Sequence, residues 1–417
     1  MQLEGGTGSS LRERLNKAAL ALLLVPAAAA AADLPATQID TTTLYYGEQD
    51  RVQVVEPVVR ATRLFGDGQI LSVQLAVDLI TGASPSGALP TGVPQTITSP
   101  SGKVSSTPAG AIPTTKFQDH RGGLDADWQT PIGKYFNSTL GMHASREKDY
   151  QSLGVTAKVS AEMFQRSLTV TAGGGYNWDS VFPVGGTPIG LSDGTEVTNG
   201  KNSKKVESFL FGVSRVMSRR WLLGLDASRT LERGYLTEPY KVISLVSFRS
   251  DSPIGQLTDN RPASRARSSL LASSVYHLDQ DILYSSYRYY KDSWGIRSNT
   301  VDASYRHDLD DGWYLEPHAR YYHQTAADFF TFGIVAGLAP PEYATSDYRL
   351  GQLTTMTLGL TFAFHVEDSP ALWTVRADYI RQAGSGTAPE NLGSASTFDL
   401  NPAINTISLV VGYSFNM

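Results

Sequence analysis

Apolar and polar residues alternate through the closing stretch of the chain, Asn405–Met417. Its apolar side consists of Ile407, Leu409, Val411, Tyr413 and Phe415. The other side is small or polar, with Val410 as its one apolar member. A period of two predicts a β-strand with one apolar face. An aromatic residue close to the terminus is also typical of the strand that closes a membrane barrel and carries its insertion signal.

The same pattern recurs upstream. Leu71–Leu79 places five apolar residues on one side and puts Asp78 on the other. Thr354–His365 likewise alternates between large apolar residues and Thr, Gly, Ala and His. Segments of about ten alternating residues, with lipid-facing side chains outside and polar ones inside, are typical of a transmembrane β-barrel. We therefore predict an all-β fold, an antiparallel transmembrane barrel.

Short turns and long loops largely alternate along the chain. Gly66–Gly68 and Ser218–Arg220 are short, whereas the loops at Gly82–Lys116, Asp179–Lys204 and Thr230–Arg261 are long. This asymmetry is typical of periplasmic turns and extracellular loops, and bacterial barrels contain an even number of strands. Counting from Ile39–Tyr46 gives about 16 strands, within an accepted range of about 12 to 16. A soluble β-sandwich would not explain apolar residues on the outside of every hairpin.

One strand of this series contains a proline. Pro57 interrupts the long segment Arg51–Phe65. Because proline cannot donate to a sheet ladder, we expect a bulge or an edge irregularity there. The loop Gly82–Lys116 is low in charge and in bulky residues, so we expect it to be a flexible surface loop.

The first residues of the chain predict export. Arg12, Arg14 and Lys17 precede the apolar run Ala18–Val25, which is followed by Pro26 and a series of alanines. This order is typical of a Sec signal peptide, with cleavage expected between Ala32 and Asp33. We expect residues 1–32 to be the signal peptide and residues 33–417 to form one barrel in the outer membrane of a Gram-negative bacterium.

Composition narrows the function classes. The chain has 417 residues, 41% of them hydrophobic, with 20 Tyr and 38 Gly, as aromatic girdles and smooth inner walls require. It contains no Cys, which excludes disulfides, a lipoprotein anchor and thiolate metal sites. The net charge of −5 and the lack of a basic run argue against nucleic acid as a partner.

Several local motifs resemble one exported barrel family of Gram-negative bacteria that is still catalogued as a domain of unknown function. The motifs are Asp78–Pro85, Ser145–Ser152, Gly234–Lys241, Tyr287–Trp294, Arg320–Gln324 with Ala327–Phe329, and Ser346–Leu350. The resemblance covers nearly the whole mature chain and implies an outer-membrane barrel without an established activity. Through the neighbourhood of the family's genes, it also implies a link to extracytoplasmic flavin or electron-transfer systems.

These motifs place charged residues and tyrosines where strands end. Two interpretations remain open: a network of paired side chains that holds strand ends and loops, or a constriction or ligand site that selects solutes. Some of the aromatic residues could also belong to an interfacial girdle. The candidate luminal or strand-end residues are Asp78, Arg146, Glu147, Asp149, Tyr240, Lys241, Arg288, Tyr290, Asp292, Arg320, Tyr322, Gln324, Asp347 and Arg349.

The connection that begins at Pro239-Tyr240-Lys241 is long enough to fold into the barrel as a plug, and an ordinary surface loop is an equal alternative. Enzyme chemistry finds little support, because the seven His residues are scattered and His318 and His323 fall on opposite faces of a strand. Asp119, His120 and Ser145 lack the flanking motif of a barrel hydrolase. We expect no catalytic residues, metal or cofactor.

The leading functional hypothesis is a non-enzymatic barrel, either a channel or a membrane scaffold. A channel predicts ion current from the purified chain, whereas a scaffold predicts a bound partner and no current. Expected partners are outer-membrane lipid, the barrel-assembly machinery during insertion, and a periplasmic protein or lipoprotein. The barrel is expected to be monomeric by default.

Overall fold

The computed structural model describes residues 37–98, 104–247, 252–309, 312–366, 371–384, 392, 396 and 398–417. The expected signal peptide and its cleavage point lie outside the described residues. Within those residues, no helix is both long and apolar enough to span a membrane.

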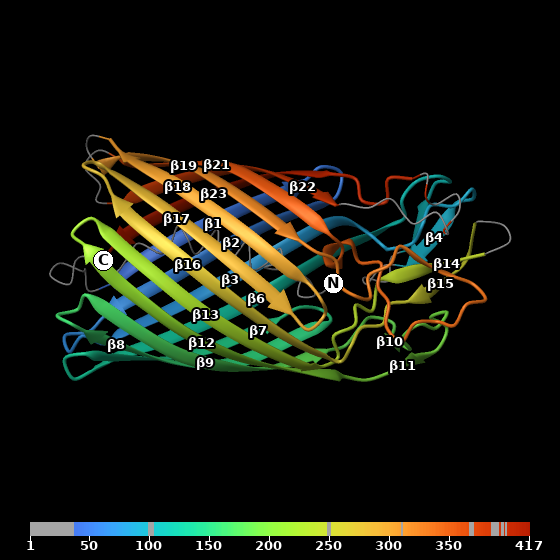
Figure 1. The fold of residues 1–417 in the computed structure, drawn as a ribbon, viewed down its shortest axis with the longest axis horizontal. Coiled ribbons are helices and arrows are strands. Elements are labelled where there is room, and N and C mark those ends of the chain that lie inside the picture. Colours follow the sequence, from blue (N-terminus) through green and yellow to red (C-terminus); the bar gives the residue numbers. More distant parts are fainter. Residues whose placement is uncertain are drawn as a thin grey trace.

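Sixteen antiparallel strands form one closed barrel, which confirms the predicted fold class and strand number (Figure 1). The strands follow one another around the barrel in chain order. They are β1 (Thr37–Glu48), β2 (Val52–Leu64), β3 (Ile70–Pro85), β6 (Thr114–Ile132), β7 (Phe136–Arg146), β8 (Tyr150–Met163), β9 (Leu168–Val181), β12 (Asn202–Ser218), β13 (Trp221–Gly234), β16 (Ser264–His277), β17 (Asp281–Asp292), β18 (Arg297–Asp308), β19 (Tyr314–Gln324), β21 (Leu353–His365), β22 (Leu372–Gly384) and β23 (Ile404–Asn416).

The first and last strands close the barrel. β1 pairs with β23 in one unbroken register, from Gln38 opposite Asn416 to Glu48 opposite Thr406. This seam leaves no free sheet edge in the wall. The C-terminus lies at the end of the barrel that carries the short turns (Figure 1).

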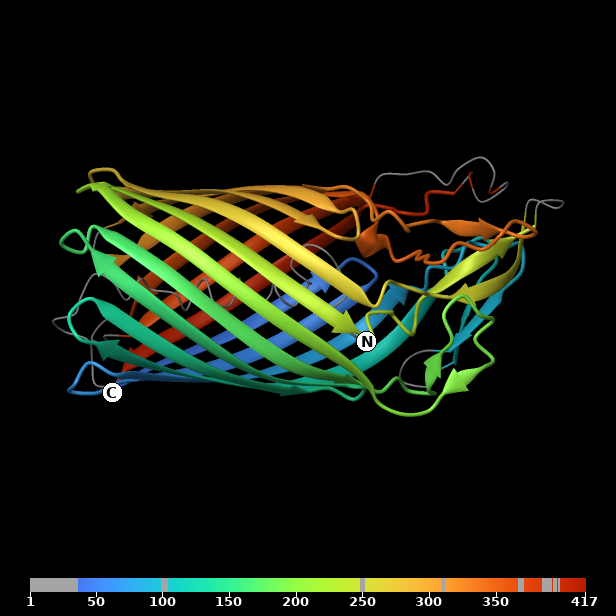
Figure 2. The ribbon, with the colours of Figure 1, turned by 60° about the horizontal axis from the view of Figure 1, so that its bottom comes forward.

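The two ends of the barrel differ in their connections. At one end, here the turn end, short turns such as residues 65–69 and 219–220 join neighbouring strands. At the other end, here the loop end, three small sheets project beyond the wall (Figure 2). They are β4 (Gln95–Thr98) with β5 (Val104–Thr107), β10 (Thr187–Pro188) with β11 (Val197–Thr198), and β14 (Val242–Val246) with β15 (Pro253–Thr258) and β20 (Gly333–Val335).

Large apolar side chains cover the outside of the wall. On β3, Leu75, Val77 and Leu79 are 45–56% exposed, while Asp78 between them is 5% exposed and faces inward. Aromatic side chains cluster outside the turn end, where the rings of Trp373 and Tyr413 lie 4.7 Å apart. An apolar outer band bordered by aromatic residues matches what a transmembrane barrel requires.

The inner side contains one apolar patch near the loop end. It explains the exception noted in the last strand, because Val410 faces inward and is fully buried. Its neighbours in this cluster are Leu44, Tyr46, Val52, Val54, Ile80 and Phe117. Burial of these side chains stabilises the wall by roughly 1.5–3 kcal/mol for each fully buried large apolar residue.

Three sequence expectations need full or partial correction. No bulge forms at Pro57, because β2 and β3 keep the same register on both sides of it, from Val55–Leu79 to Val58–Ala76. The alternative that we expected, a local irregularity, is present, since the pairing with β3 omits Glu56 and Pro57. The expected long connection Thr230–Arg261 starts too early, since β13 continues to Gly234. The first part of Gly82–Lys116 also packs inward, with Leu89 2% exposed against Val246.

Candidate functional site: a charged bridge at the loop end

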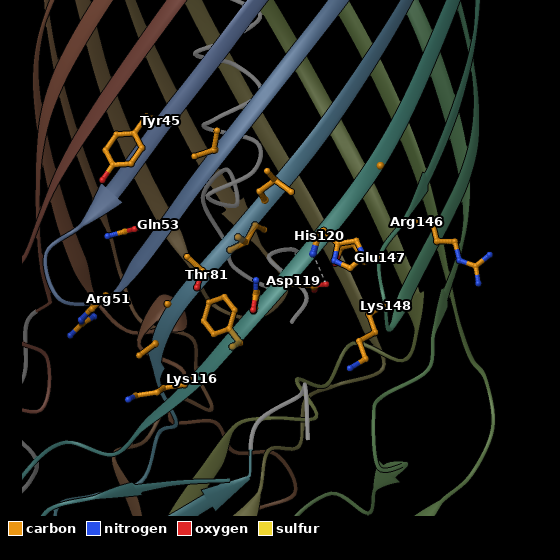
Figure 3. Close-up of a pocket in the computed structure, with 18 residues that line it drawn as sticks. Tyr45, Arg51, Gln53, Thr81, Lys116, Asp119, His120, Arg146, Glu147 and Lys148 are labelled. Atoms are coloured by element: carbon orange, nitrogen blue, oxygen red, sulfur yellow. Dashed lines mark hydrogen bonds between the residues drawn. The ribbon is translucent and has the colours of Figure 1, made fainter. Parts of the chain in front are cut away.

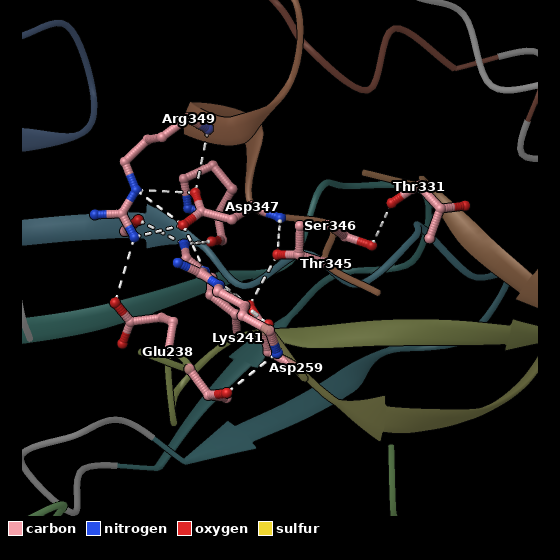
Figure 4. Close-up of polar contacts among 12 residues, drawn as sticks. Glu238, Lys241, Asp259, Thr331, Thr345, Ser346, Asp347 and Arg349 are labelled. Carbon is pink, nitrogen blue, oxygen red and sulfur yellow. Dashed lines mark hydrogen bonds and ion pairs between the residues drawn. The ribbon is translucent and has the colours of Figure 1, made fainter. Parts of the chain in front are cut away.

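Three loop segments meet inside the mouth at the loop end. They are residues 237–241 after β13, residues 259–261 after β15, and residues 345–350, which end in the short 3₁₀ helix η2 (Tyr348–Leu350). We call these three segments together the bridge. Figure 4 shows Glu238, Lys241, Asp259, Thr345, Asp347 and Arg349 gathered in one hydrogen-bonded group.

Asp347 lies at the centre of the bridge and is fully buried. Its Oδ2 atom lies 2.6 Å from Arg349 Nη2 and 3.0 Å from Arg261 Nη2. Arg261 also donates to Asp259 over 2.7 Å, and Thr345 donates to the same carboxylate over 2.8 Å. A buried charge is tolerated only when it is paired and hydrogen-bonded, and these carboxylates and guanidinium groups meet that condition.

Burial and charge pairing oppose each other in this group. Burial alone would raise the pKa of Asp347, but the adjacent Arg349 and Arg261 hold that pKa well below its usual range. Burial lowers the pKa of Lys241 from 10.5 to about 8, although Asp347 and Glu238 favour its charged form. Burial raises the pKa of Asp259 despite the contact with Arg261. Asp347 is therefore the ionised anchor of the bridge.

The bridge is attached to the wall at widely separated strands. Lys241 Nζ donates to Ser84 Oγ over 3.1 Å, at the end of β3. Gln324, the last residue of β19, donates through Nε2 to the carbonyl oxygens of Arg349 and Gly351 over 3.0 and 2.7 Å. The first segment of the bridge leaves the wall at the end of β13. In the ring of 16 strands, β13 is six strands away from β3 and four strands away from β19. The bridge therefore runs across the mouth and not along one side of it.

A second set of contacts supports the bridge from within. The Tyr348 ring lies between two cations, 5.6 Å from the Arg51 guanidinium and 5.7 Å from Lys241 Nζ. Leu350 is fully buried against Tyr290 and Trp294 near the end of β17. Cation–π contacts and apolar packing add to the ion pairs, so η2 has one defined position in the mouth.

Buried ion pairs also follow the inner wall at the loop end. Arg121 on β6 lies 2.9 Å from Asp78 on β3 and 3.8 Å from Glu147. Further around the barrel, Lys204 lies 3.6 Å from Asp179. Arg265 pairs with Asp292, and its guanidinium lies 4.1 Å from the Trp294 ring centroid. These contacts support the interpretation of the strand-end residues as a wall network.

Three carboxylates near β7 come close together. Oxygens of Asp119, Glu147 and Asp149 lie within 4.8 Å of one another, which is the spacing of a cation site built from oxygen ligands. Arg121 lies beside Glu147, and the Tyr240 hydroxyl donates to Asp149 over 2.6 Å. Protein groups therefore already offset part of the negative charge of this cluster.

Deeper in the lumen, a histidine sits within a charged group on the wall. His318 Nε2 lies 3.1 Å from Asp302, and Arg376 donates to His318 Nδ1 over 3.0 Å. Arg376 also donates to Asp378 over 2.9 Å. These partners make Nε2 the protonated nitrogen of His318. Arg320 lies on the same inner wall, in register with Asp302.

The candidate residues from the sequence divide into several places. Asp149, Tyr240, Lys241, Gln324, Asp347 and Arg349 belong to the bridge or its attachments. Asp78, Glu147, Tyr290, Tyr322 and Asp292 belong to the inner wall at the loop end. Arg288 and Arg320 lie further down the inner wall. Arg146 ends β7, as a strand-end residue should, but it is not luminal, because it is exposed on the outward face that also carries Leu140 and Met142.

Sequence reasoning missed part of the bridge. Asp259 and Arg261, which are 1% and 3% exposed, were not among the candidates. Glu238 falls inside the motif Gly234–Lys241 but had no role assigned, and Arg349 lies 3.3 Å from it. Loop residues have no period that reveals burial, so no sequence signal marks Asp259 or Arg261.

Residues 12–415 match the family described as "Protein of unknown function (DUF3570)". The chain belongs to this family. The match confirms the resemblance seen in the sequence motifs and covers the whole barrel. A search of curated proteins found no significant match to this DUF3570 member.

A comparison with solved structures finds outer-membrane proteins at low sequence identity. OmpT of Vibrio cholerae, in a form lacking loop L8, is 10% identical, with a TM-score of 0.39 and coverage of 91% of this chain and 98% of that one. A bacterial polysaccharide outer-membrane secretin is 8% identical, with a TM-score of 0.45 and coverage of 92% and 100%. OccK2 (OpdF) of Pseudomonas aeruginosa is 9% identical, with a TM-score of 0.39 and coverage of 91% and 97%.

Proposed function

We propose that this DUF3570 protein is a gated, non-enzymatic channel of the Gram-negative outer membrane, with the bridge as its gate. The observation that carries the proposal is the position of the bridge across the loop-end mouth, attached at Ser84 on β3 and at Gln324 on β19. Because long loops of such barrels face the outside, the gate would control entry from the cell exterior.

The lumen wall supports conduction as the function. Inward-facing side chains of Arg60, Asp127, Lys158, Arg288 and Arg320 make it polar and charged along its length. Charged side chains of both signs on opposite parts of a wall create a field that selects small hydrophilic solutes. An apolar filling of the whole lumen would have favoured a purely structural barrel.

The bridge can act as a gate because its stability depends on charge pairing. Removal of one partner from a buried ion pair costs roughly 3–5 kcal/mol, since the other charge stays buried and uncompensated. Asp347 pairs with both Arg349 and Arg261, so it is the residue on which the closed position depends most. The wall strands do not rely on these contacts, which leaves the barrel intact when the bridge moves.

Single-channel recording in a planar bilayer tests the proposal. Wild-type protein should give infrequent openings, and Asp347→Asn should raise the open probability at least about tenfold, because tenfold corresponds to 1.4 kcal/mol. Asp193→Asn removes a carboxylate that is fully exposed in the loop between β10 and β11, and it should leave the recording unchanged. Heat-modifiable migration on a gel verifies that each variant has folded into a barrel.

If wild type and Asp347→Asn both migrate as folded barrels on the gel and neither gives current in the bilayer, the channel is ruled out. The barrel would then be better explained as a scaffold for a periplasmic or lipoprotein partner. Equal, steady current from both proteins would instead show that the lumen is open and that the bridge is not a gate.

A further inference from the structure

A shallow groove lies on the outer wall near the loop end. It has a volume of about 1670 Å³ and crosses β1, β2, β3, β6 and the end of β7. Its lining includes Tyr45, Gln53, Val55, Leu79, Thr81 and His120, all of them exposed residues on outward-facing positions of their strands. Figure 3 shows the lining residues in place along these strands.

The groove lies at the edge of the apolar outer band. Val55 and Leu79 are 38% and 51% exposed on its side toward the middle of the barrel. Toward the loop end, the outward-facing residues become polar. They are Thr81 on β3, and Gln118 and Lys116 on β6. One groove therefore contacts the acyl region and the headgroup region of the surrounding lipid at the same time.

The polar part of the groove is basic. Lys116, Arg146 and Lys148 are exposed lining residues, and no carboxylate among the described residues pairs with them. In Figure 3, Lys116 and Lys148 lie nearest the loops. Two acidic residues, Asp119 and Glu147, also line the groove, but Glu147 is turned toward Arg121 on the inner wall. The groove thus presents a net positive charge outward.

This arrangement suits one class of ligand. We propose that the groove binds the phosphate-bearing headgroup of a lipid in the outer leaflet, with its acyl chains against Val55 and Leu79. Basic side chains beside a membrane attract anionic headgroups through charge, and Arg adds paired N–H donors that match phosphate oxygens. A soluble anion would use the cations but would leave the apolar half of the groove in contact with bulk lipid.

Other outward cations occur at the loop end, which allows a matched control. Lys291 at the end of β17 and Arg297 at the start of β18 are exposed, face outward and lie outside the groove. The double variant Arg146→Gln with Lys148→Gln removes two positive charges from the groove, while Lys291→Gln with Arg297→Gln removes two positive charges elsewhere. All four substitutions replace exposed side chains, so the barrel itself should fold normally.

Native mass spectrometry of the full barrel in detergent measures the binding directly. Diphosphorylated lipid A, its dephosphorylated counterpart and inorganic phosphate serve as the three probes. We expect the wild type to bind lipid A at least about tenfold more tightly than the dephosphorylated form, since each nearby cation contributes about 1 kcal/mol. The groove variant should lose at least about tenfold in affinity, and the control variant less than about twofold.

Three outcomes would overturn the proposal. An unchanged affinity in the groove variant would show that the groove is not the site. Equal losses in the groove and control variants would show a diffuse basic belt without a site. Displacement of lipid A by millimolar inorganic phosphate would show a site for a soluble anion. None of these readouts depends on whether the barrel conducts ions.

Discussion

The phenolic oxygen of Tyr240 lies 2.6 Å from Asp149 Oδ2, which joins two loops whose contacting residues are 91 positions apart in the sequence. The Val184 amide donates to the same hydroxyl over 2.9 Å. Tyr240 therefore attaches the bridge to the ends of β7 and β9, in addition to the attachments at Ser84 and Gln324.

Tyr240→Phe should loosen this corner of the bridge. The substitution leaves Asp149 and the Val184 amide without their shared partner, at a cost of about 1–3 kcal/mol for a desolvated polar group. Hydrogen exchange at Val184 should accelerate at least about fivefold while exchange in β16 and β17 stays unchanged. Unaltered exchange at Val184 would show that this contact does not hold the loop.

Gate opening should depend on pH through Lys241. Its pKa is about 8 in the closed bridge and returns toward 10.5 once the side chain reaches water. The open state then binds the proton more tightly, so a rise in pH from 8 to 10 favours the closed state. Burial raises the pKa of Tyr240 and of Tyr348 above 10, so their titration lies above this window.

Recordings of open probability at pH 7, 8, 9 and 10 measure this effect. The open probability should fall between pH 8 and 10 in the wild type, and the dependence in that window should disappear in Lys241→Met. An open probability that rises with pH in the wild type would contradict the assignment of Lys241 as the titrating group.

A glycine at the end of β13 sets the point where the chain leaves the wall for the bridge. Gly234 has φ +118°, and a Cβ atom there would lie 2.1 Å from the Ser203 carbonyl oxygen. Gly234→Ala should therefore destabilise the loop end by more than about 1 kcal/mol. Faster exchange of the Tyr235 amide, which donates to Ser203 over 3.0 Å, would report it.

Gly255→Ala is the matched control for this prediction. A Cβ atom at Gly255 meets no other atom within 4 Å, so the same chemical change adds no clash. If both variants show equal exchange at Tyr235, the close approach at Gly234 is not what constrains the chain.

Charges on the inner wall should determine ion selectivity. Arg288→Ala and Arg320→Ala each remove an inward-facing cation, so reversal potentials under a salt gradient should shift toward cation preference. Arg229→Ala removes an outward-facing cation that donates to Ser268 on the outer face, and it should have no effect. A shift of equal size in Arg229→Ala would mean that the selectivity does not arise in the lumen.

The wall was predictable because each wall strand obeys a local rule. Leu75, Val77 and Leu79 face outward and Asp78 faces inward for the same reason that their residue types alternate: lipid lies on one side and the lumen on the other. Val410 broke the pattern in the sequence, and the structure explains it through an apolar patch inside the wall. Pro57 shows the opposite case, because a local signal for a bulge had no effect on the register.

The bridge was not predictable to the same extent because its partners are distant in the chain. Asp347 and Arg349 were recognised from their motif, but Asp259 and Arg261 lie in a loop without periodicity. The ion pair between Arg261 and Asp347 joins residues 86 positions apart, and only the closed barrel brings the two loops together. The side on which Arg146 lies was open for a related reason, since a charged residue at a strand end can face either the lumen or the outside.

The seam between β1 and β23 has a consequence for biogenesis. Its contacts join residues as far apart as Gln38 and Asn416, at opposite ends of the barrel sequence. One edge of β1 therefore stays unpaired until the final strand is available, and such an edge readily pairs with other chains. A chain truncated before Ile404 would lack its closing partner throughout, so the last strand controls whether the other fifteen become a membrane protein or an aggregate.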